Sequence, residues 1–410
     1  MNQSFPSQMV LLEKQGQYAQ MLVAARHLAE VAPRDALAPF YAGQAHFWNG
    51  DFNAASAQWK QAVALDPQLK SQVGPLQGQL ARIRRAYPTL QLRPVQLAPS
   101  EVQAHKTALV KRALSLLNAR RAQELDAWSE QLEKSHSAGQ DGLSDSFVVS
   151  ATLASPQSNS EAVWDERQKL LESWDGALPA SRYAKLALFR FWTNRAWKER
   201  GDGFASEVTP PSWKKMKQRL GQASQVAARL PASAQKTPLF WADTIRFSML
   251  AGLSPSDVRS LGAEAIQHFP GDRCVDCAIG FALLPQWTGE PGEWQRFFTA
   301  RADAIGGEAG DIAYAQMVVQ QMEFFEEKTF WQRTGAHWPR ARRGFQALLR
   351  RQPNSVSLAT WLLLQARLNH DAATARAMVL RLNNRANANK WNSPRDFSLL
   401  RLAVLDPANR

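Results

Sequence analysis

Apolar residues recur along the chain at spacings of three and four positions, and proline or glycine interrupts this pattern at short intervals. The spacing is that of amphipathic helices, whereas no run alternates apolar and polar residues for long enough to predict a sheet. From residue 161 onward the pattern predicts seven successive helices, at Glu161–Trp174, Ser181–Gly201, Ser212–Leu230, Pro238–Gly252, Ser256–Phe269, Cys274–Leu284 and Trp294–Ala304. Their lengths suit paired antiparallel helices, so the pattern indicates an all-α protein.

The region before residue 161 is more varied. Ala86–Ser100 contains three prolines and is predicted to be a linker or an extended segment. Glu101–Lys134 is predicted to form one long helix, with Ser100 as its N-cap. Ser135–Ser160 is rich in serine, glycine, glutamine and aspartate, which predicts a mobile loop.

Near its N-terminus the chain repeats itself. Glycine, an aromatic residue and proline occur at Gly16, Tyr18 and Pro33, and 34 residues later at Gly50, Phe52 and Pro67. Between them, small residues at positions 43, 55 and 62 would let two helices approach closely, and Trp59 would fill the space beside them. This pattern resembles the tetratricopeptide repeat and predicts helices at Leu37–Asn49 and Phe52–Leu65.

The C-terminal region has similar spacing. Phe345, Leu348 and Pro353 are placed as in the second N-terminal repeat, and Asp371 lies 18 residues after Pro353, as Asp51 follows Pro33. We therefore predict an α-solenoid of antiparallel helical hairpins. Its four segments are a tetratricopeptide-like repeat pair at 1–85, a linker, long helix and mobile loop at 86–160, a helical-hairpin body at 161–334 and a basic tetratricopeptide-like hairpin at 335–410.

The resemblance to tetratricopeptide repeats implies a binding groove. Its positions in the second repeat correspond to Leu37, Phe40, Gln44, Phe47 and Trp48. Repeats that clamp a C-terminal carboxylate have Lys, Arg and Asn there, whereas these residues are mostly apolar. We expect an apolar helix or peptide as the ligand, and a helix of the chain itself is the alternative occupant.

Charge is distributed unevenly along the chain. Of the net charge of +13, the last 76 residues contribute 13 basic and 3 acidic side chains, and residues 236–334 before them hold 8 basic and 13 acidic ones. The basic block could bind nucleic acid or an acidic partner through Arg340, Arg342, Arg343, Arg350 and Arg351. Alternatively the two blocks face each other, or the charges form a solvated helical surface.

Cys274 and Cys277 are the only cysteines, so no disulfide framework is expected and a reducing, cytoplasmic location is the default. The Cys-x-x-Cys follows Pro270-Gly271 at a predicted helix N-terminus, where backbone amides favour a thiolate and hence redox chemistry. A zinc site would need two more ligands, and His268 is the nearest. Two buried structural thiols are the alternative that we favour.

No other motif predicts catalysis, a metal or a cofactor. The seven histidines lack metal-ligand spacing, and neither a phosphate-binding loop nor a nucleophile elbow is present. Glu323, Glu326 and Glu327 are expected to form a solvated helix face. Most of the fifteen tryptophans are expected to fill space between helices, although a few could line a groove. No apolar run approaches the ~20 residues of a membrane span, so we predict no membrane insertion.

Two stretches in the middle of the chain resemble a bacterial family called domain of unknown function 4034. One is Glu172–Gly201, with Trp174, Trp197 and Arg200-Gly201 as matching elements. The other is Leu283–Phe298, which matches at Leu284-Pro285, Trp287 and Gly289. The resemblance would cover roughly residues 160–350. It implies a helical fold, with no assigned activity or catalytic residues.

These observations predict a non-enzymatic scaffold or adaptor that binds another protein through a concave helical surface. Nucleic-acid or acidic-partner binding by the basic C-terminal block is the first alternative. Thiol redox activity at Cys274 and Cys277 is the second.

Overall fold

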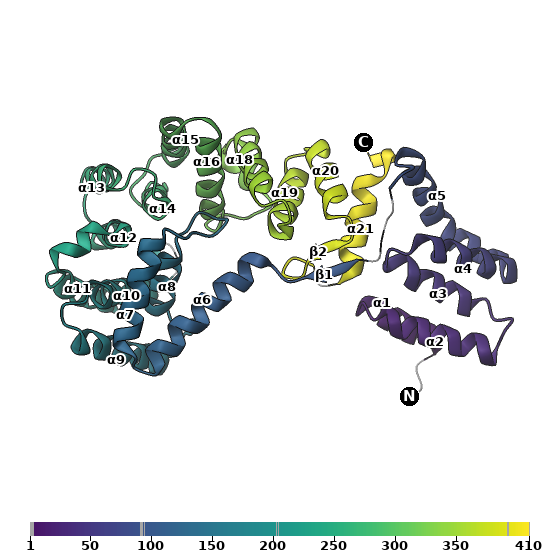
Figure 1. The fold of residues 1–410 in the computed structure, drawn as a ribbon, viewed down its shortest axis with the longest axis horizontal. Coiled ribbons are helices and arrows are strands. Elements are labelled where there is room, and N and C mark those ends of the chain that lie inside the picture. The colour runs from purple at the N-terminus through teal and green to yellow at the C-terminus, as the bar shows by residue number, and fades with distance from the viewer. Residues whose placement is uncertain are drawn as a thin grey trace. The chain divides into compact units, whose positions relative to one another are not determined.

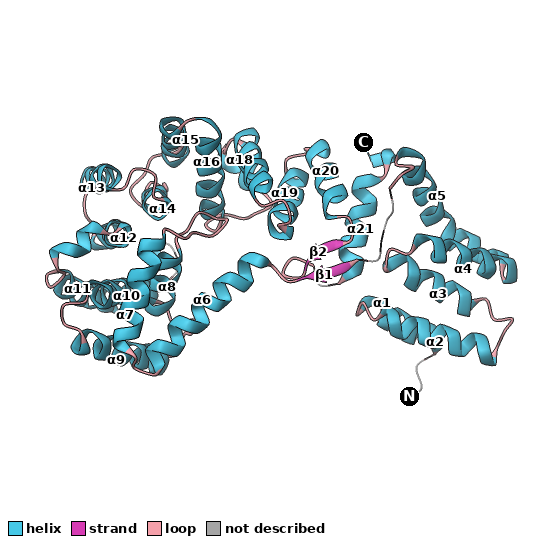
Figure 2. Cartoon of the chain, viewed as in Figure 1, coloured by secondary structure: helices cyan, strands magenta, loops and turns pink. Residues whose placement is uncertain are grey.

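The computed structural model describes residues 4–90, 93, 95–201, 203, 205–391 and 393–409. This part of the chain contains helices α1–α21 and one short two-stranded sheet, which confirms the predicted all-α class (Figures 1 and 2). The chain divides into two compact units. Unit 1 combines Met1–Glu101 with Gln352–Arg410, and unit 2 is Val102–Arg351.

Unit 1 is made from both ends of the sequence. Its helices are α1 (Phe5–Lys14), α2 (Tyr18–Val31), α3 (Leu37–Trp48), α4 (Phe52–Leu65), α5 (Lys70–Ala86), α19 (Val356–Leu368), α20 (Ala372–Leu382) and α21 (Pro394–Leu405), with 3-10 turns at Pro67–Leu69 and Pro407–Asn409. Its strands β1 (Gln96–Ala98) and β2 (Arg385–Asn387) pair in parallel, with Leu97 opposite Ala386. The first predicted segment and most of the last therefore share one compact unit, whereas residues 335–351 of the last segment belong to unit 2.

Close contact between α3 and α4 explains the small residues of the second repeat. A Cβ atom added to Gly43 would lie 2.3 Å from Cδ1 of Trp59, so only glycine fits at this crossing. The Trp59 side chain is fully buried, and its ring centroid lies 5.2 Å from that of Phe47. The predicted helices at Leu37–Asn49 and Phe52–Leu65 are thus present as a tightly packed hairpin.

Five helical hairpins share one turn. The left-handed residue of each turn is Gly16, Gly50, Arg120, Gly252 or His370, with φ of 70°, 82°, 53°, 78° and 55° respectively. In each turn this residue donates its N–H to the carbonyl three residues back, and the next residue donates to the carbonyl five residues back. Both bonds belong to the Schellman arrangement that ends a helix.

Arg120→Gly is expected to stabilise the hairpin of α6 (Glu101–Asn118) and α7 (Ala122–Ser135) by about 1 kcal/mol, because a side chain in the left-handed region costs energy that glycine avoids. Arg120 is exposed, so little packing is lost. Urea denaturation of the two proteins measures the difference. Lys111→Gly, at an exposed position inside α6, should instead destabilise by about 1 kcal/mol. A loss of stability in Arg120→Gly would contradict the argument.

Unit 2 consists of successive hairpins that follow one another in an arc (Figure 1). Its helices are α6 (Glu101–Asn118), α7 (Ala122–Ser135), α8 (Asp145–Ala154), α9 (Glu161–Ala177), α10 (Arg182–Arg200), α11 (Pro210–Ala227), α12 (Pro238–Ala251), α13 (Pro255–His268), α14 (Arg273–Ala282), α15 (Glu293–Ile305), α16 (Gly307–Met322), α17 (Phe330–Thr334) and α18 (Trp338–Arg351). Short 3-10 helices lie at Ala205–Glu207 and Ala232–Lys236. Helices α9 to α15 correspond to the seven that the hydrophobic pattern predicts.

Two predictions for residues 101–160 were wrong. The single helix Glu101–Lys134 is divided, because the left-handed Arg120 ends α6 and reverses the chain into α7. The segment predicted as a mobile loop contains α8, in which Val149 and Leu153 are buried. Its start is fixed by Ser144, whose hydroxyl accepts the N–H of Phe147 at 3.2 Å.

The proline-containing segment 86–100 includes β1, which the sequence had suggested only as an extended stretch. Just before β1, the N–H of Val95 donates to the carbonyl of Asn49 at 3.0 Å, which ties the segment to the α3–α4 turn. Residues 91, 92 and 94, including one of the three prolines, lie outside the described residues.

Candidate functional site

The predicted groove of the second repeat is largely covered by the chain itself. Phe40, Phe47 and Trp48 are buried, and Leu37 and Gln44 are partly buried. Helix α21 lies against this surface: the Ser398 hydroxyl donates to the Trp48 carbonyl at 3.0 Å, and Arg395 stacks over the Trp48 ring at 4.9 Å. Phe40, Phe47 and Trp48 are therefore not open to a peptide, and at Trp48 a helix of the chain itself lies on the predicted groove.

The C-terminal arginines contact the acidic residues that precede them. Arg340 pairs with Asp303 at 2.6 Å and Arg343 with Asp311 at 2.6 Å. Arg350 and Arg351 both bind Glu308, at 2.6 and 3.0 Å, and their hydrogen bonds lower the pKa of its carboxyl group. Arg342 is partly buried. Of the three explanations for the charge segregation, the structure thus supports the two blocks facing each other, across α15, α16 and α18.

The cysteine pair lacks the environment of a reactive thiol. The carboxylate of Asp272 accepts the N–H groups of Cys274 and Val275 at 2.8 and 3.1 Å, so these helix N-terminal amides are not available to a thiolate. Burial raises the pKa of Cys274 to about 12, and burial also raises the pKa of Cys277 well above its ordinary value. Both thiols are therefore protonated near neutral pH, against the redox hypothesis.

A zinc site at the cysteines is also not formed. His268 stacks on the Trp241 ring, with centroids 4.9 Å apart. Within the described residues, no three His, Cys, Asp or Glu side chains gather in a group that could hold a metal ion.

Four aromatic rings converge where α10, α14 and α16 end. Trp197 lies in the last turn of α10, Phe281 near the end of α14, Trp287 in the following loop and Phe324 just beyond α16. Ring centroids are 4.8 Å apart for Trp197 and Trp287, 4.5 Å for Phe281 and Phe324, and 5.8 Å for Phe281 and Trp287. Trp197, Trp287 and Arg200 come from the two stretches that carry the family resemblance, so these distant stretches meet in space.

The loop after α14 places Trp287 on this cluster. Its turn is tight, because a Cβ atom on Gly289 would lie 1.9 Å from the carbonyl oxygen of Leu283. The Thr288 hydroxyl donates to the Ala282 carbonyl at 2.8 Å and so caps the helix. Trp287 is thereby turned back against Phe281.

Two arginines complete the cluster. The guanidinium of Arg200 lies 5.0 Å from the Trp287 ring centroid and donates to the carbonyls of Gly201 and Gly203 at 3.0 Å. The guanidinium of Arg246 lies 5.2 Å from the Phe281 ring and has neither a hydrogen bond nor an ion pair with any described residue. Burial and the charge of Arg190 both lower the pKa of Arg246. We call Trp197, Arg200, Arg246, Phe281, Trp287 and Phe324 the aromatic–arginine cluster.

Phe324 gives the cluster an exposed apolar member, because 41% of its surface remains accessible. Aromatic and arginine side chains are enriched at protein interfaces relative to the rest of the surface. The cluster therefore has the composition of a contact surface. Sequence reasoning had not singled out Arg246 or Phe281, and it had described Glu323 beside Phe324 only as part of an acidic helix face.

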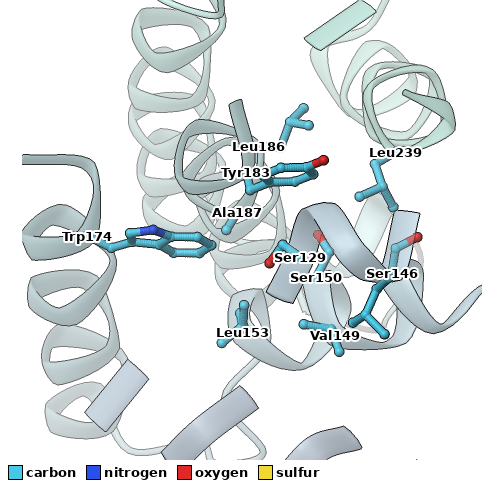
Figure 3. Close-up of a pocket in the computed structure, with 11 residues that line it drawn as sticks. Ser129, Ser146, Val149, Ser150, Leu153, Trp174, Tyr183, Leu186, Ala187 and Leu239 are labelled. Atoms are coloured by element: carbon cyan, nitrogen blue, oxygen red, sulfur yellow. The ribbon is translucent and has the colours of Figure 1, made fainter. Parts of the chain in front are cut away.

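A cavity in the core of unit 2 is too small for a substrate. It has a volume of about 20 Å³, room for roughly one water molecule, between α7, α8 and α10 (Figure 3). Three serines line it among apolar side chains, and the Ser150 hydroxyl has no hydrogen-bond partner among the described residues. This lining suits a single structural water.

The arrangement defines a protein of stacked helical hairpins. Within this class, residues 110–252 match the profile of a family described as domain of unknown function DUF4034. The match begins inside α6 and ends after α12, earlier at both ends than the range of 160–350 suggested by the resemblance. It includes Trp197, Arg200 and Arg246. A comparison with curated proteins gave no match.

Among the described residues, none of the helices combines enough length with enough apolar character to span a membrane.

Proposed function

We propose that this chain is a helical-repeat scaffold that binds another protein, and that the aromatic–arginine cluster of unit 2 belongs to its contact surface. The observation that carries the proposal is the exposed Phe324 ring packed on Phe281, whose own ring lies 5.2 Å from the guanidinium of Arg246. An exposed apolar ring beside arginine side chains favours a protein partner that covers it.

Unit 2 offers better support for this role than the N-terminal groove. Trp48 is already covered by α21, whereas Phe324 keeps 41% of its surface accessible. Nucleic-acid binding by the C-terminal block is not proposed, because Arg340, Arg343, Arg350 and Arg351 already contact carboxylates.

Two finer features belong to the same proposal. We place the protein in a reducing cytoplasm, which is supported by the two free thiols of Cys274 and Cys277. We assign its N-terminal hairpins to the tetratricopeptide type, supported by the 34-residue spacing and by the matching turns at Gly16 and Gly50.

The test is quantitative affinity capture from the native cell, comparing the natural chain with Phe324→Ser and Arg246→Gln. Each substitution should reduce recovery of the bound partner about tenfold, the effect of losing an interface residue worth more than 1 kcal/mol.

Matched controls remove similar groups elsewhere in unit 2. Val163→Ser changes a residue that is 39% exposed on α9, and Arg112→Gln removes an exposed guanidinium stacked on Trp128 at 4.6 Å. Both should recover the partner normally. Unchanged recovery with Phe324→Ser and Arg246→Gln would reject the cluster as the contact surface.

A further inference from the structure

Residues 136–144, between α7 and α8, lie across other helices of unit 2, and we call this segment the strap. On one side it contacts α14 and α16. The amide of Gln316 donates to the Gln140 carbonyl at 3.2 Å, and the Ser144 hydroxyl lies 3.6 Å from the Cys274 sulfur. The strap thus covers the first turn of α14, including a thiol that is only 2% exposed.

The other side of the strap is held by α6. Lys106 pairs with Asp141 at 2.5 Å, and His105 Nε2 lies 2.9 Å from the Asp145 carboxylate. The second oxygen of Asp145 accepts the Ser137 hydroxyl at 2.7 Å. Polar contacts therefore fasten both ends and the middle of the segment.

Gly142 allows the strap to pack closely against α14 and α16. Its φ of 81° is left-handed, and an added Cβ atom would come within 2.7 Å of both Arg273 and Gln316. Glycine is needed here for two reasons, the backbone conformation and the close approach. A side chain at this position would push the strap away from α14 and α16.

Polar contacts hold the strap in place, and the strap contributes no buried apolar side chain. None of residues 136–143 is buried, whereas α7 and α8 on either side contribute the buried Trp128, Val149 and Leu153. Segments with few buried apolar contacts open at a lower free energy than the helices around them. The strap can therefore open while the hairpins remain folded.

We propose that the strap is a detachable cover that controls access to the first turn of α14. In the closed state its polar contacts hold it over Arg273 and Cys274, and in the open state that turn and its thiol are accessible. This proposal is separate from the contact surface at the aromatic–arginine cluster, and each can fail without the other.

The two native thiols provide the readout. Labelling of the full-length protein by N-ethylmaleimide at pH 7, followed by mass spectrometry, reports how often Cys274 becomes accessible. Gly142→Ala should accelerate labelling of Cys274 roughly tenfold, because it adds the left-handed penalty only to the closed state. Hydrogen exchange should increase in the strap and at the start of α14.

Gly252→Ala is the matched control. Gly252 has a similar φ of 78°, at the end of α12, but nothing lies within 4 Å of its added Cβ atom. It carries the same backbone penalty without displacing the strap, so Cys274 labelling should stay within about twofold of the natural rate. Equal acceleration in both variants would show global loosening and overturn the proposal.

A second variant keeps the test decisive if Gly142→Ala fails to fold. Lys106→Gln removes an anchor without backbone strain and should accelerate labelling by about threefold. Lys134→Gln removes an exposed ion pair with Glu130 on α7 and should have no effect. The proposal would be overturned if Lys106→Gln labelled Cys274 at the rate of the unsubstituted protein and Gly142→Ala either did the same or did not fold.

Discussion

Gly344→Ala is expected to destabilise unit 2 by about 3 kcal/mol or more, because it forces two helices apart. Gly344 lies where α18 crosses α16, and a Cβ atom there would come within 2.0 Å of the backbone oxygen of Asp311. Backbone cannot rotate away as a side chain can. Separation would also loosen Asp311 from Arg340 and Arg343.

Hydrogen exchange of the amides in α16 and α18 measures this effect within unit 2. Gly221→Ala serves as the control, because Gly221 lies in an exposed part of α11 with nothing within 4 Å of an added Cβ atom. There alanine should stabilise the helix by roughly 0.5–1 kcal/mol. If Gly344→Ala slowed hydrogen exchange in α16 and α18 as Gly221→Ala slows it in α11, the argument that α16 and α18 are too close for a side chain at position 344 would be wrong.

The second large effect is expected at a buried carboxylate. Asp276, on α14, is fully buried between Arg273 at 2.6 Å and Arg301 of α15 at 2.8 Å. Asp276→Asn removes the carboxylate that both guanidinium groups contact directly, and both of these groups are largely buried. We expect a loss of about 3–5 kcal/mol, the usual result of breaking a buried ion pair from one side.

Urea denaturation combined with hydrogen exchange of α14 and α15 tests this expectation. Asp165→Asn is the control, because Asp165 also contacts an arginine, Arg195 at 2.6 Å, but is 54% exposed. An exposed pair is worth less than about 1 kcal/mol. Similar losses in the two variants would mean that burial of Asp276 does not determine its importance.

The sequence predicted those helices that have a helical spacing of apolar residues and a proline or glycine near their end. Helices α9 to α15 end near proline or glycine, and their bounds were found to within a few residues. The break between α6 and α7 was missed because its left-handed residue is Arg120, whereas left-handed turns are recognised in a sequence by glycine or asparagine. Helix α8 was missed because the serine-rich composition around it is typical of loops.

The candidate site was predictable only in part. The stretches around Trp197 and Trp287 stood out as motifs, but one sequence does not reveal that they meet. Arg246 and Phe281 lie on α12 and α14 with no distinguishing local pattern, so only the packing of these helices identifies them. The groove positions around Trp48 were placed correctly on one helix, but the coverage of Trp48 by α21 depends on a contact with a residue 350 positions away.

The discontinuous make-up of unit 1 has a consequence for biosynthesis. A ribosome that adds about 5–20 residues per second completes Trp48 roughly 20–70 s before Arg395, which stacks on it. Throughout that interval the apolar surface of α3 has no α21 to cover it, while the continuous unit 2 emerges and can fold. The N-terminal hairpins are therefore translated before unit 2 but completed only after it, and during this interval their uncovered apolar surface is open to chaperones and to aggregation.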